Sequence, residues 1–381
     1  MIPIALPFLG VEEADAARDV VLSGWVSQGP QVAAFEREFA TLVGASHATA
    51  VSNCTTALHL ALVAAKVGAG DEVITASHSF IATANCIKYV GGVPVFVDID
   101  SDTYNIDPAK VEEAITSRTR AIITVHQMGM PCDLSALVDI AHRHGLILIE
   151  DAACAAGSEI SINETWERIG KAHGHITCFS FHPRKVITTG EGGMLTTSDP
   201  ALDRQFKLLR QHGMSVPDTV RHGSAQVIFE DYLEVGFNYR MTDIQAAVGR
   251  KQLAKLSGIV ASRRRLASNY TELLGNIEGV RLPFEPAWAR SNWQSYCVRL
   301  SNHFDQKTIM QRLLDRGVAT RRGIMCSHRE APYAVGYKRH DLRQSEHAQD
   351  HAILLPLYAQ MTADDQARVA EALTSELRSN S

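Results

Sequence analysis

Short apolar runs alternate with helical segments along much of the chain, and this alternation constrains the fold more than any other feature. The runs that predict strands are 48–52, 72–75, 94–98, 121–125, 146–150, 176–181 and 194–197. Segments with helical periodicity lie between several of these runs, at 56–65, 81–89, 108–115 and 134–142. Strands joined through helices form a mostly parallel sheet with helices on both faces, so we predict an α/β fold. Ligands of such sheets bind at the carboxyl ends of the strands.

The two ends of the chain have a different pattern. Helical segments at 12–22 and 35–42 flank a loop at 24–30. Residues 250–274 predict a long helix rich in Lys, Arg and Leu, followed by a strand at 292–300 and helices at 306–316 and 364–375. Because 381 residues exceed one ordinary core, we predict a large domain, 1–249, and a small C-terminal α+β domain, 250–381, which begins with the long connecting helix.

Charge and cysteine usage narrow the classes of partner. The formal net charge is −5 without blocks of like charge, which argues against nucleic-acid binding and against a basic membrane patch. No apolar run approaches the ~20 residues that cross a bilayer, and the N-terminus does not resemble a signal peptide. The seven cysteines lack C-x-x-C pairs, so we predict a reduced, cytoplasmic protein without a metal site that acts on small molecules.

Lys185 lies between the apolar run 176–181 and a glycine-rich turn that contains Gly190, Gly192 and Gly193. A lysine that is partly dehydrated and near other cations loses its proton readily and attacks carbonyl groups. A single lysine is more often a solvated surface group, so the neighbouring motifs decide between the two interpretations.

Asp151 follows directly after the apolar strand 146–150, at the edge where ligands bind. A carboxylate in this position could hold a heteroaromatic nitrogen in its protonated form, because opposite charges favour each other's ionised state. The alternative is a helix cap or a salt bridge at the end of the strand.

Small polar residues follow the strand 48–52, and a helix begins immediately after them. Thr55, through its hydroxyl and amide, and Thr56, through its amide, could bind a phosphate at this helix N-terminus. The alternative is ordinary helix capping by Ser52, Asn53 or Thr55.

Two further positions could contribute to the same site. Phe80 or His78, after the strand 72–75, could lie against a flat ring, although an aromatic residue there is more often part of the core. The hydroxyl of Ser180, five residues before Lys185, could face the same anion. A phosphate cradle, an aromatic residue, an acid and a reactive lysine in this order together predict a site for pyridoxal 5′-phosphate.

The sequence resembles the DegT/DnrJ/EryC1/StrS family of sugar aminotransferases over nearly its whole length. The motifs that carry the resemblance are Gly24-Trp-Val-Ser-Gln-Gly29, Cys54-Thr-Thr-Ala-Leu58, Gly70-Asp-Glu-Val-Ile74, Val97-Asp-Ile-Asp100, Glu150-Asp-Ala-Ala153, Phe179-Ser-Phe-His-Pro-Arg-Lys185, Gly190-Glu-Gly-Gly193 and Gly236-Phe-Asn-Tyr-Arg240. The resemblance implies fold type I of the pyridoxal-phosphate enzymes, with a homodimer that shares its active sites.

The resemblance also implies a role for each site residue. Lys185 would bind the cofactor as a Schiff base, Asp151 would pair with the pyridine nitrogen, and Phe80 would stack on the ring. The phosphate would be held by Thr55, Thr56 and Ser180, and by Asn238 of the neighbouring subunit; no local pattern assigns a ligand to Asn238. Substrate contacts are expected from five residues: Trp25, Ser27, Arg321, Arg322 and His328.

Two residues depart from the family pattern. Cys154 stands where the family often has Gln, or sometimes His, in contact with the ring hydroxyl, and a thiol is a weaker donor. Cys54 stands where a glycine commonly precedes the phosphate-binding threonine. Neither change affects Lys185.

The implied reaction moves the amino group of L-glutamate to a keto sugar by a ping-pong mechanism. We expect the C4 carbonyl of a UDP-linked 4-keto-6-deoxyhexose as acceptor, with a C3-keto sugar or a keto-cyclitol as alternatives. Some relatives are sugar dehydratases, in which histidine replaces the lysine or an iron–sulfur cluster is added. Non-catalytic regulatory relatives usually lack the lysine or the aspartate. Lys185 and Asp151 are both present and the cysteines lack a cluster-like spacing, which favours the aminotransferase.

Overall fold

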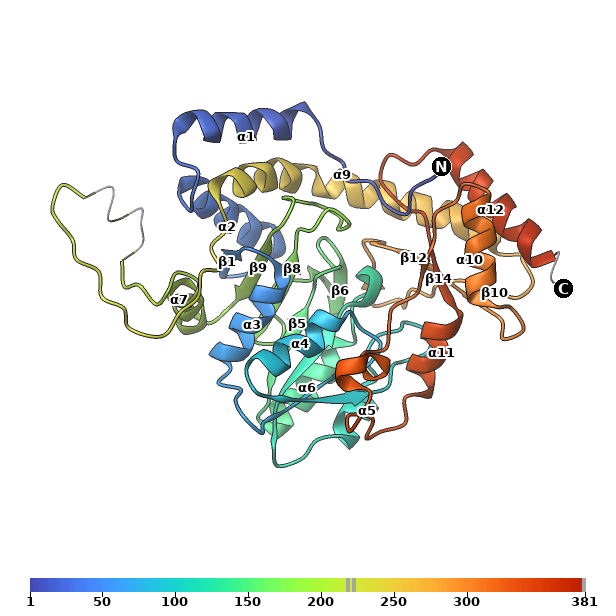
Figure 1. Ribbon diagram of the computed structural model, residues 1–381, viewed down its shortest axis with the longest axis horizontal. Coiled ribbons are helices and arrows are strands. Elements are labelled where there is room, and N and C mark those ends of the chain that lie inside the picture. Colours follow the sequence, from blue (N-terminus) through green and yellow to red (C-terminus); the bar gives the residue numbers. More distant parts are fainter. Residues whose placement is uncertain (217–219, 221–223, 379–381) are drawn as a thin grey trace.

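A seven-stranded sheet forms the centre of the computed structural model, which describes residues 1–216, 220 and 224–378 (Figure 1). The strand order is β1-β9-β8-β5-β4-β2-β3. The strands are His47–Val51 (β1), Glu72–Ala76 (β2), Val93–Val97 (β3), Thr119–Val125 (β4), Ile147–Asp151 (β5), Ile176–Ser180 (β8) and Gly193–Thr197 (β9). β9 runs antiparallel to both of its neighbours, whereas β3, β2, β4, β5 and β8 pair in parallel. This confirms the predicted mostly parallel sheet.

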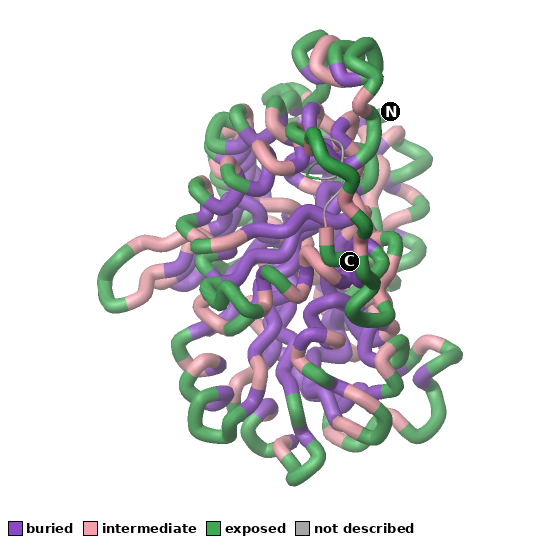
Figure 2. The backbone as a smooth tube through the Cα atoms, turned by 90° about the vertical axis from the view of Figure 1, so that its left-hand side faces the viewer, coloured by how far each residue is buried: buried purple, intermediate pink, exposed green. Residues whose placement is uncertain are grey.

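Helices cover both faces of the sheet. One face packs against Pro30–Val43 (α2), Leu134–His144 (α6) and Asp243–Leu274 (α9), and the other against Cys54–Ala64 (α3), Ile81–Tyr89 (α4) and Pro200–Leu209 (α7). Successive strand residues point to opposite faces: Leu148 lies in the first core and Ile149 in the second. Burial on both faces explains why the strands are rich in apolar residues, and Figure 2 shows that the backbone through the centre of the molecule is buried.

The C-terminal part is a smaller α+β unit, as predicted. Its antiparallel sheet has the order β10-β12-β14-β13 and shares one core with the C-terminal part of α9 and with α10 and α12. The elements are Val280–Arg281 (β10), Tyr296–Leu300 (β12), Arg321–Arg322 (β13), Ala352–Leu355 (β14), Gln306–Asp315 (α10), Arg343–His351 (α11) and Ala363–Arg378 (α12). The long helix α9 begins at Asp243, where Thr242 and Gln245 form a capping box, and it therefore spans the predicted domain boundary. Ile2, at the other end of the chain, pairs with Val318 and lies in the core of this unit.

The sequence did not predict the hairpin between β5 and β8. Its strands are Glu159–Ile162 (β6) and Thr165–Arg168 (β7), and Ala289–Arg290 (β11) pairs with β6. The turn residues Asn163 and Glu164 have φ values of 48° and 65°, a conformation that glycine usually provides. Because this turn contains no glycine, its sequence does not indicate a hairpin. Among the described residues, the other α-helices are Val11–Ser23 (α1) and Pro108–Glu113 (α5), and short 3-10 helices lie at Gln127–Gly129, Ser327–Arg329 and Ala331–Tyr333. Within the described residues, no helix has the length and apolar character of a membrane span.

Candidate active site

Lys185 lies in the loop that connects β8 to β9. The loop returns to the strand because the Phe181 carbonyl accepts hydrogen bonds from the Thr189 amide (3.0 Å) and the Thr188 hydroxyl (2.7 Å). The Lys185 amine is 3.1 Å from the Cys154 sulfur, and its side chain therefore points toward the loop that follows β5. The predicted strand and turn thus bring the lysine to the carboxyl edge of the sheet.

The pKa of Lys185 differs from the sequence expectation. Burial disfavours the ammonium, but Cys154, Cys54 and Asp151 outweigh burial and raise the pKa above its ordinary value. The sequence predicted neighbouring cations that would promote loss of the proton. The strongest electrostatic influences on the amine are instead thiols and a carboxyl group, and these favour the ammonium.

Asp151 is the last residue of β5 and is 4% exposed. Its carboxylate accepts hydrogen bonds from the Ala153 amide (3.1 Å) and from the Thr83 hydroxyl of α4 (2.9 Å). Burial raises the pKa of Asp151, and these two hydrogen bonds and the Lys185 charge oppose that rise. Sequence reasoning missed Thr83. The available signal was its position in the first turn of α4, directly after the predicted ring contact Phe80.

The N-terminus of α3 is the predicted phosphate cradle. Asn53 caps this helix, since its side chain accepts a 2.9 Å hydrogen bond from the Thr56 amide. The Thr56 hydroxyl donates to the Asn53 carbonyl at 2.7 Å. Among the described residues, the Thr55 hydroxyl has no hydrogen-bond partner. The capping alternative therefore accounts for Thr56 as the structure stands, whereas Thr55 keeps its hydroxyl for a ligand.

Gly193 brings this helix N-terminus to the strand that carries Ser180. A Cβ atom at Gly193 would lie 2.5 Å from the Asn53 backbone, so only glycine permits this close approach. Gly193 pairs with Ser180 in the sheet, and within the described part of the chain the Ser180 hydroxyl has one hydrogen bond, a long 3.4 Å bond from the His182 amide. Two hydroxyls, those of Thr55 and Ser180, therefore border the same helix terminus. This arrangement fits a phosphate group.

Of the two aromatic candidates, only Phe80 is accessible. Phe80 precedes α4 and is 62% exposed, which rules out the alternative that it belongs to the core. His78 is 1% exposed, and its ring lies 5.8 Å from that of Tyr104.

The loop with Trp25 and Ser27 is fixed to the start of α9. The Asp243 amide donates to the Ser27 carbonyl (3.0 Å), and the Asp243 carboxylate accepts from the Gly29 amide (2.8 Å). The Trp25 indole nitrogen donates to the Gln28 carbonyl at 3.1 Å. α9 also reaches the glycine-rich turn, because the Gln245 side chain donates to the Glu191 carbonyl at 2.7 Å. The helix therefore joins the loop and the turn, a link that no local pattern predicted.

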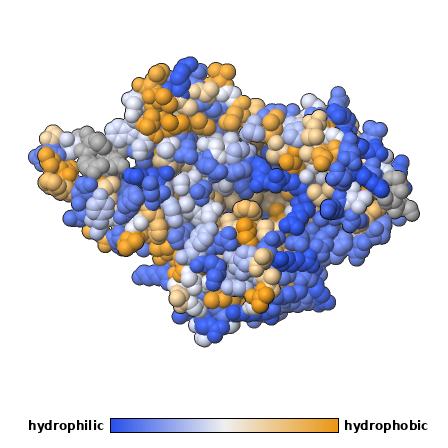
Figure 3. All heavy atoms as spheres, in the orientation of Figure 1, coloured by the Kyte–Doolittle hydropathy of each residue, from blue (hydrophilic) through white to orange (hydrophobic). Residues whose placement is uncertain are grey.

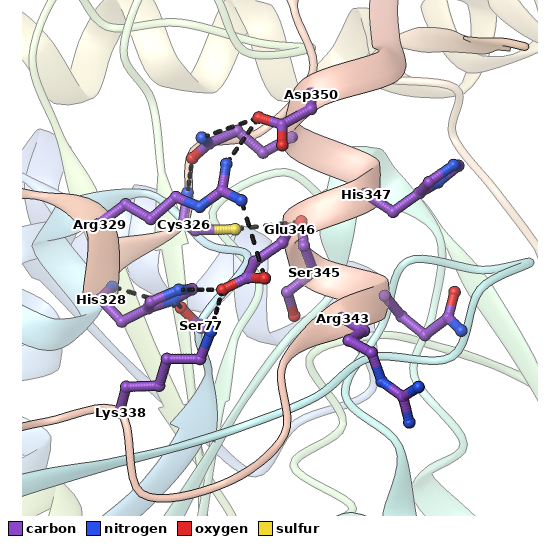
Figure 4. A network of polar contacts seen from close by, with 12 residues as sticks. Ser77, Cys326, His328, Arg329, Lys338, Arg343, Ser345, Glu346, His347 and Asp350 are labelled. Atoms are coloured by element: carbon purple, nitrogen blue, oxygen red, sulfur yellow. Dashed lines mark hydrogen bonds and ion pairs between the residues drawn. The ribbon is translucent and has the colours of Figure 1, made fainter. Parts of the chain in front are cut away.

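The three small-domain candidates differ in their surroundings. Arg321 is exposed, and its charge, together with burial, lowers the pKa of Arg184 next to Lys185. Arg322 is exposed and lies 3.5 Å from Glu330. His328 is 5% exposed, and its ring nitrogens lie 2.6 Å from the Ser77 hydroxyl and 3.0 Å from Glu346 (Figure 4). Arg321 is therefore adjacent to the lysine loop, whereas His328 is engaged in a buried network.

Two polar residues of the segment before β12 hold the lysine loop and the Cys154 loop together, and sequence reasoning missed both. The Asn292 side chain donates to the carbonyls of Cys154 and Ala156, each at 2.8 Å. The Gln294 side chain donates to the Arg184 carbonyl at 3.0 Å. Their sequence neighbourhood looked like part of a strand, and their partners are distant in the chain.

Asn238 is exposed and lies in the segment that returns to the sheet after the excursion from α7. It forms a bridge with Gln211, and its side-chain oxygen lies 3.3 Å from the Arg240 guanidinium. The Tyr239 carbonyl accepts a 2.8 Å hydrogen bond from the Ser52 amide, next to the helix cap Asn53. No group of three or more His, Cys, Asp or Glu side chains that could hold a metal ion occurs among the residues described.

Comparison with known proteins gives matches along the whole chain. The family described as the DegT/DnrJ/EryC1/StrS aminotransferase family matches residues 7–374. The spore coat polysaccharide biosynthesis protein SpsC of Bacillus subtilis (strain 168) is 38% identical over 378 residues, 98% of this chain and 96% of that protein. The crystal structure of the aminotransferase TlmJ from Streptoalloteichus hindustanus is 32% identical, with a TM-score of 0.91 and coverage of 100% and 99%. Helicobacter pylori PseC, an aminotransferase involved in the biosynthesis of pseudoaminic acid, is 26% identical, with a TM-score of 0.91 and coverage of 99% of both chains.

Proposed function

This chain belongs to the DegT/DnrJ/EryC1/StrS aminotransferase family, and we propose that it transfers the amino group of L-glutamate to the C4 carbonyl of a UDP-linked 4-keto-6-deoxyhexose. It is a sugar aminotransferase with the fold of pyridoxal-phosphate enzymes. The glutamate donor, the nucleotide and the C4 position are the proposed refinements. A C3-keto sugar or a keto-cyclitol in place of the 4-keto sugar would change the acceptor and leave the class of reaction intact.

The observation that carries the proposal is the electrostatic coupling of Lys185 and Asp151. Asp151 ends β5 and Lys185 follows the neighbouring strand β8, and the charge of each affects the pKa of the other. Pyridoxal 5′-phosphate, when bound, accepts the electron pair that the donor's α-carbon releases. The residues fit this cofactor: Asp151 would hold its ring nitrogen protonated, and Thr55 and Ser180 would bind its phosphate.

Lys185 has two tasks in this scheme. It would bind the cofactor covalently, and once displaced by the amino donor it would take the proton from the donor's α-carbon. The charge of Asp151 is what maintains the ring as an acceptor, so the two residues act on opposite ends of the same ring. Phe80, exposed beside α4, would stack on one face.

Two features support a sugar acceptor. SpsC and PseC bear names that refer to polysaccharide and to pseudoaminic acid biosynthesis, respectively. The loop with Trp25 and Ser27 and the exposed Arg321 lie near the lysine loop, where an anionic nucleotide could be bound by a cation. Arg322 and His328 remain candidates, although His328 would have to give up a present partner to contact a substrate.

We propose that the active protein is a homodimer in which Asn238 reaches the phosphate of the neighbouring subunit. The arm, residues 224–237, extends away from the molecule beside α7 and carries exposed apolar side chains (Figures 1 and 3). Val227, Phe229 and Val235 are 84%, 89% and 91% exposed. Apolar groups so exposed on a protruding segment are typical of a subunit interface.

All seven cysteines are free, which supports a cytoplasmic site of action.

The experiment is a panel of UDP-, dTDP- and GDP-linked 3-keto and 4-keto sugars, together with keto-cyclitols, each offered with L-glutamate. Products are identified by mass, and the position of the new amine by NMR. We expect amination at C4 of a UDP-linked sugar and formation of 2-oxoglutarate, with no product from the Lys185→Ala variant. Amination of another acceptor would replace the proposed substrate, and absence of any product with every acceptor would contradict the reaction.

A further inference from the structure

Two segments that are far apart in the sequence meet beside the proposed cofactor site. One is the loop Ser77 to Phe80, between β2 and α4; the other begins at Cys326 in the C-terminal part. The Ser327 amide donates to the Ser77 carbonyl at 2.8 Å, and His78 and Cys326 form a backbone bridge. The C-terminal part therefore holds the loop by its backbone.

A polar chain of three side chains reinforces this contact (Figure 4). The Ser77 hydroxyl lies 2.6 Å from Nδ1 of His328 and also accepts from the His328 amide at 3.3 Å. The Glu346 carboxylate can only accept, so Nε2 of His328 carries the proton that Glu346 accepts at 3.0 Å. In the neutral imidazole Nδ1 is then an acceptor, and the Ser77 hydroxyl donates to it. Both ring nitrogens of His328 thus have a partner.

The three hydrogen-bonded side chains Ser77, His328 and Glu346 do not have the nucleophilic arrangement of a serine hydrolase. In that arrangement Nε2 of the histidine faces the serine and Nδ1 faces the acid, which is the reverse of the order found here. Ser77 is also completely buried, so its oxygen cannot meet a substrate. The Ser77–His328–Glu346 clamp therefore has a structural or positioning role.

Cations hold the acid of the clamp in place. Glu346 also contacts Lys338 and lies 3.8 Å from the Arg329 guanidinium, which in turn binds Asp350 at 2.6 Å. A carboxylate between two cations stays ionised and keeps accepting the His328 proton. Glu346, the acidic residue of the clamp, is thus held in place on α11.

The loop that the clamp holds leads directly to the proposed cofactor site. Ser79 lies 3.1 Å from the Thr83 hydroxyl, which donates to Asp151. Phe80 lies between these two residues in the sequence and is 62% exposed.

We propose that His328 is a positioning residue that holds the loop Ser77 to Phe80, so that Phe80 meets the cofactor ring and Thr83 keeps its bond to Asp151. The C-terminal part would thereby control the cofactor site without touching the cofactor. This inference rests on the proposed role of Phe80.

The test measures binding of pyridoxal 5′-phosphate to protein from which the cofactor has been removed. Variants His328→Ala, Phe80→Leu and the double variant form a cycle, and His347→Gln, a histidine of α11 bonded to Asn302 at 2.8 Å, is the control. We expect each single variant to weaken binding about three- to tenfold, the size of one aromatic stacking contact, and to reduce the visible circular dichroism of the bound cofactor. The double variant should bind no worse than Phe80→Leu alone.

Additive losses in the cycle would overturn the proposal, because they would show that His328 acts independently of Phe80. If His328→Ala does not fold, Ser77→Ala and His328→Asn replace it: the first removes the hydroxyl, and the second retains an acceptor for it. Ser77→Ala should reproduce the loss, and His328→Asn should restore part of the affinity; equal affinities for both would also overturn the proposal. If the unmodified protein binds no cofactor, the proposed function and this inference both fail, whereas normal binding with an additive cycle removes only the role of His328.

Discussion

Lys185 is the residue on which the proposed chemistry depends most. Replacing it by alanine should retain non-covalent binding of the cofactor, because Asp151, Thr55 and Ser180 are untouched. Turnover should fall at least ~10²- to 10⁴-fold, the usual contribution of a positioned base. Steady-state transamination and the cofactor content of the purified protein measure the two effects. Lys207→Ala, which removes a half-buried lysine paired with Asp203 on α7, should leave both unchanged.

Thr83 adjusts the acidity of Asp151. Because the Thr83 hydrogen bond lowers the pKa of a carboxyl group that burial raises, Thr83→Val should raise that pKa further. Asp151 would then lose its charge at a higher pH, and the acid limb of the pH profile of kcat/KM should move upward. Thr83→Ser retains a hydroxyl and should keep the original profile. A profile that is identical in the valine variant would remove Thr83 from the site.

His78 makes the fold sensitive to acid. Burial lowers its pKa from 6.5 to about 3, so between these pH values His78 binds a proton in the unfolded chain but not in the folded chain. The free energy of unfolding should therefore fall as the pH drops from about 6.5 toward 3, by about 1.4 kcal/mol per pKa unit at most. His78→Phe keeps a ring against Tyr104 and should lose this part of the pH dependence. Urea unfolding at several pH values measures it; parallel curves for both proteins would contradict the assignment.

At the scale of helices and strands, the sequence predicted the features that depend on the local pattern of apolar residues. The ends of β5 and β8, and hence Asp151 and Lys185, were predictable because short apolar segments of the sequence mark both buried strands. The β6–β7 hairpin was not, since its turn at Asn163 and Glu164 carries no glycine. Partners such as Thr83 and Asn292 could not be predicted either, because tertiary packing alone brings them to the site.

The start of α9 organises the loop before α2. Asp243 accepts three backbone hydrogen bonds, from Gly29, Gln31 and Val32. Asp243→Ala would leave these amides without the acceptor, so we expect a loss of ~2 kcal/mol or more in the free energy of unfolding. KM for the keto sugar should rise as well, since this loop carries Trp25 and Ser27. Asp243→Asn keeps an acceptor oxygen and should lose less; equal losses would show that the hydrogen bonds are not the cause.

At the scale of the whole molecule, α9 and the N-terminal segment connect the two proposed domains. α9 spans the proposed division at residue 249, and Ile2 crosses to the C-terminal core, so the two proposed domains share elements at both of their connections. Such sharing favours limited relative motion of the two parts.

The proposed homodimer predicts that the arm forms part of the subunit interface. Phe229→Asp places a charge on an 89% exposed apolar side chain, so the folded chain should tolerate it while the subunit interface does not. Sedimentation should show monomers, and cofactor affinity should fall because Asn238 no longer reaches the neighbouring site. Ser224→Asp, a polar position at the start of the arm, is the control. A dimeric Phe229→Asp protein with unchanged affinity would contradict the proposed interface.

The central claim, that this fold delivers one lysine to pyridoxal 5′-phosphate, can be tested directly by borohydride reduction of the protein with bound cofactor, followed by peptide mass spectrometry. The account predicts a pyridoxyl group on the peptide that contains Lys185, and no label there after prior treatment with excess glutamate. A label on a different lysine, or a cofactor-loaded protein that gains no label, would contradict it.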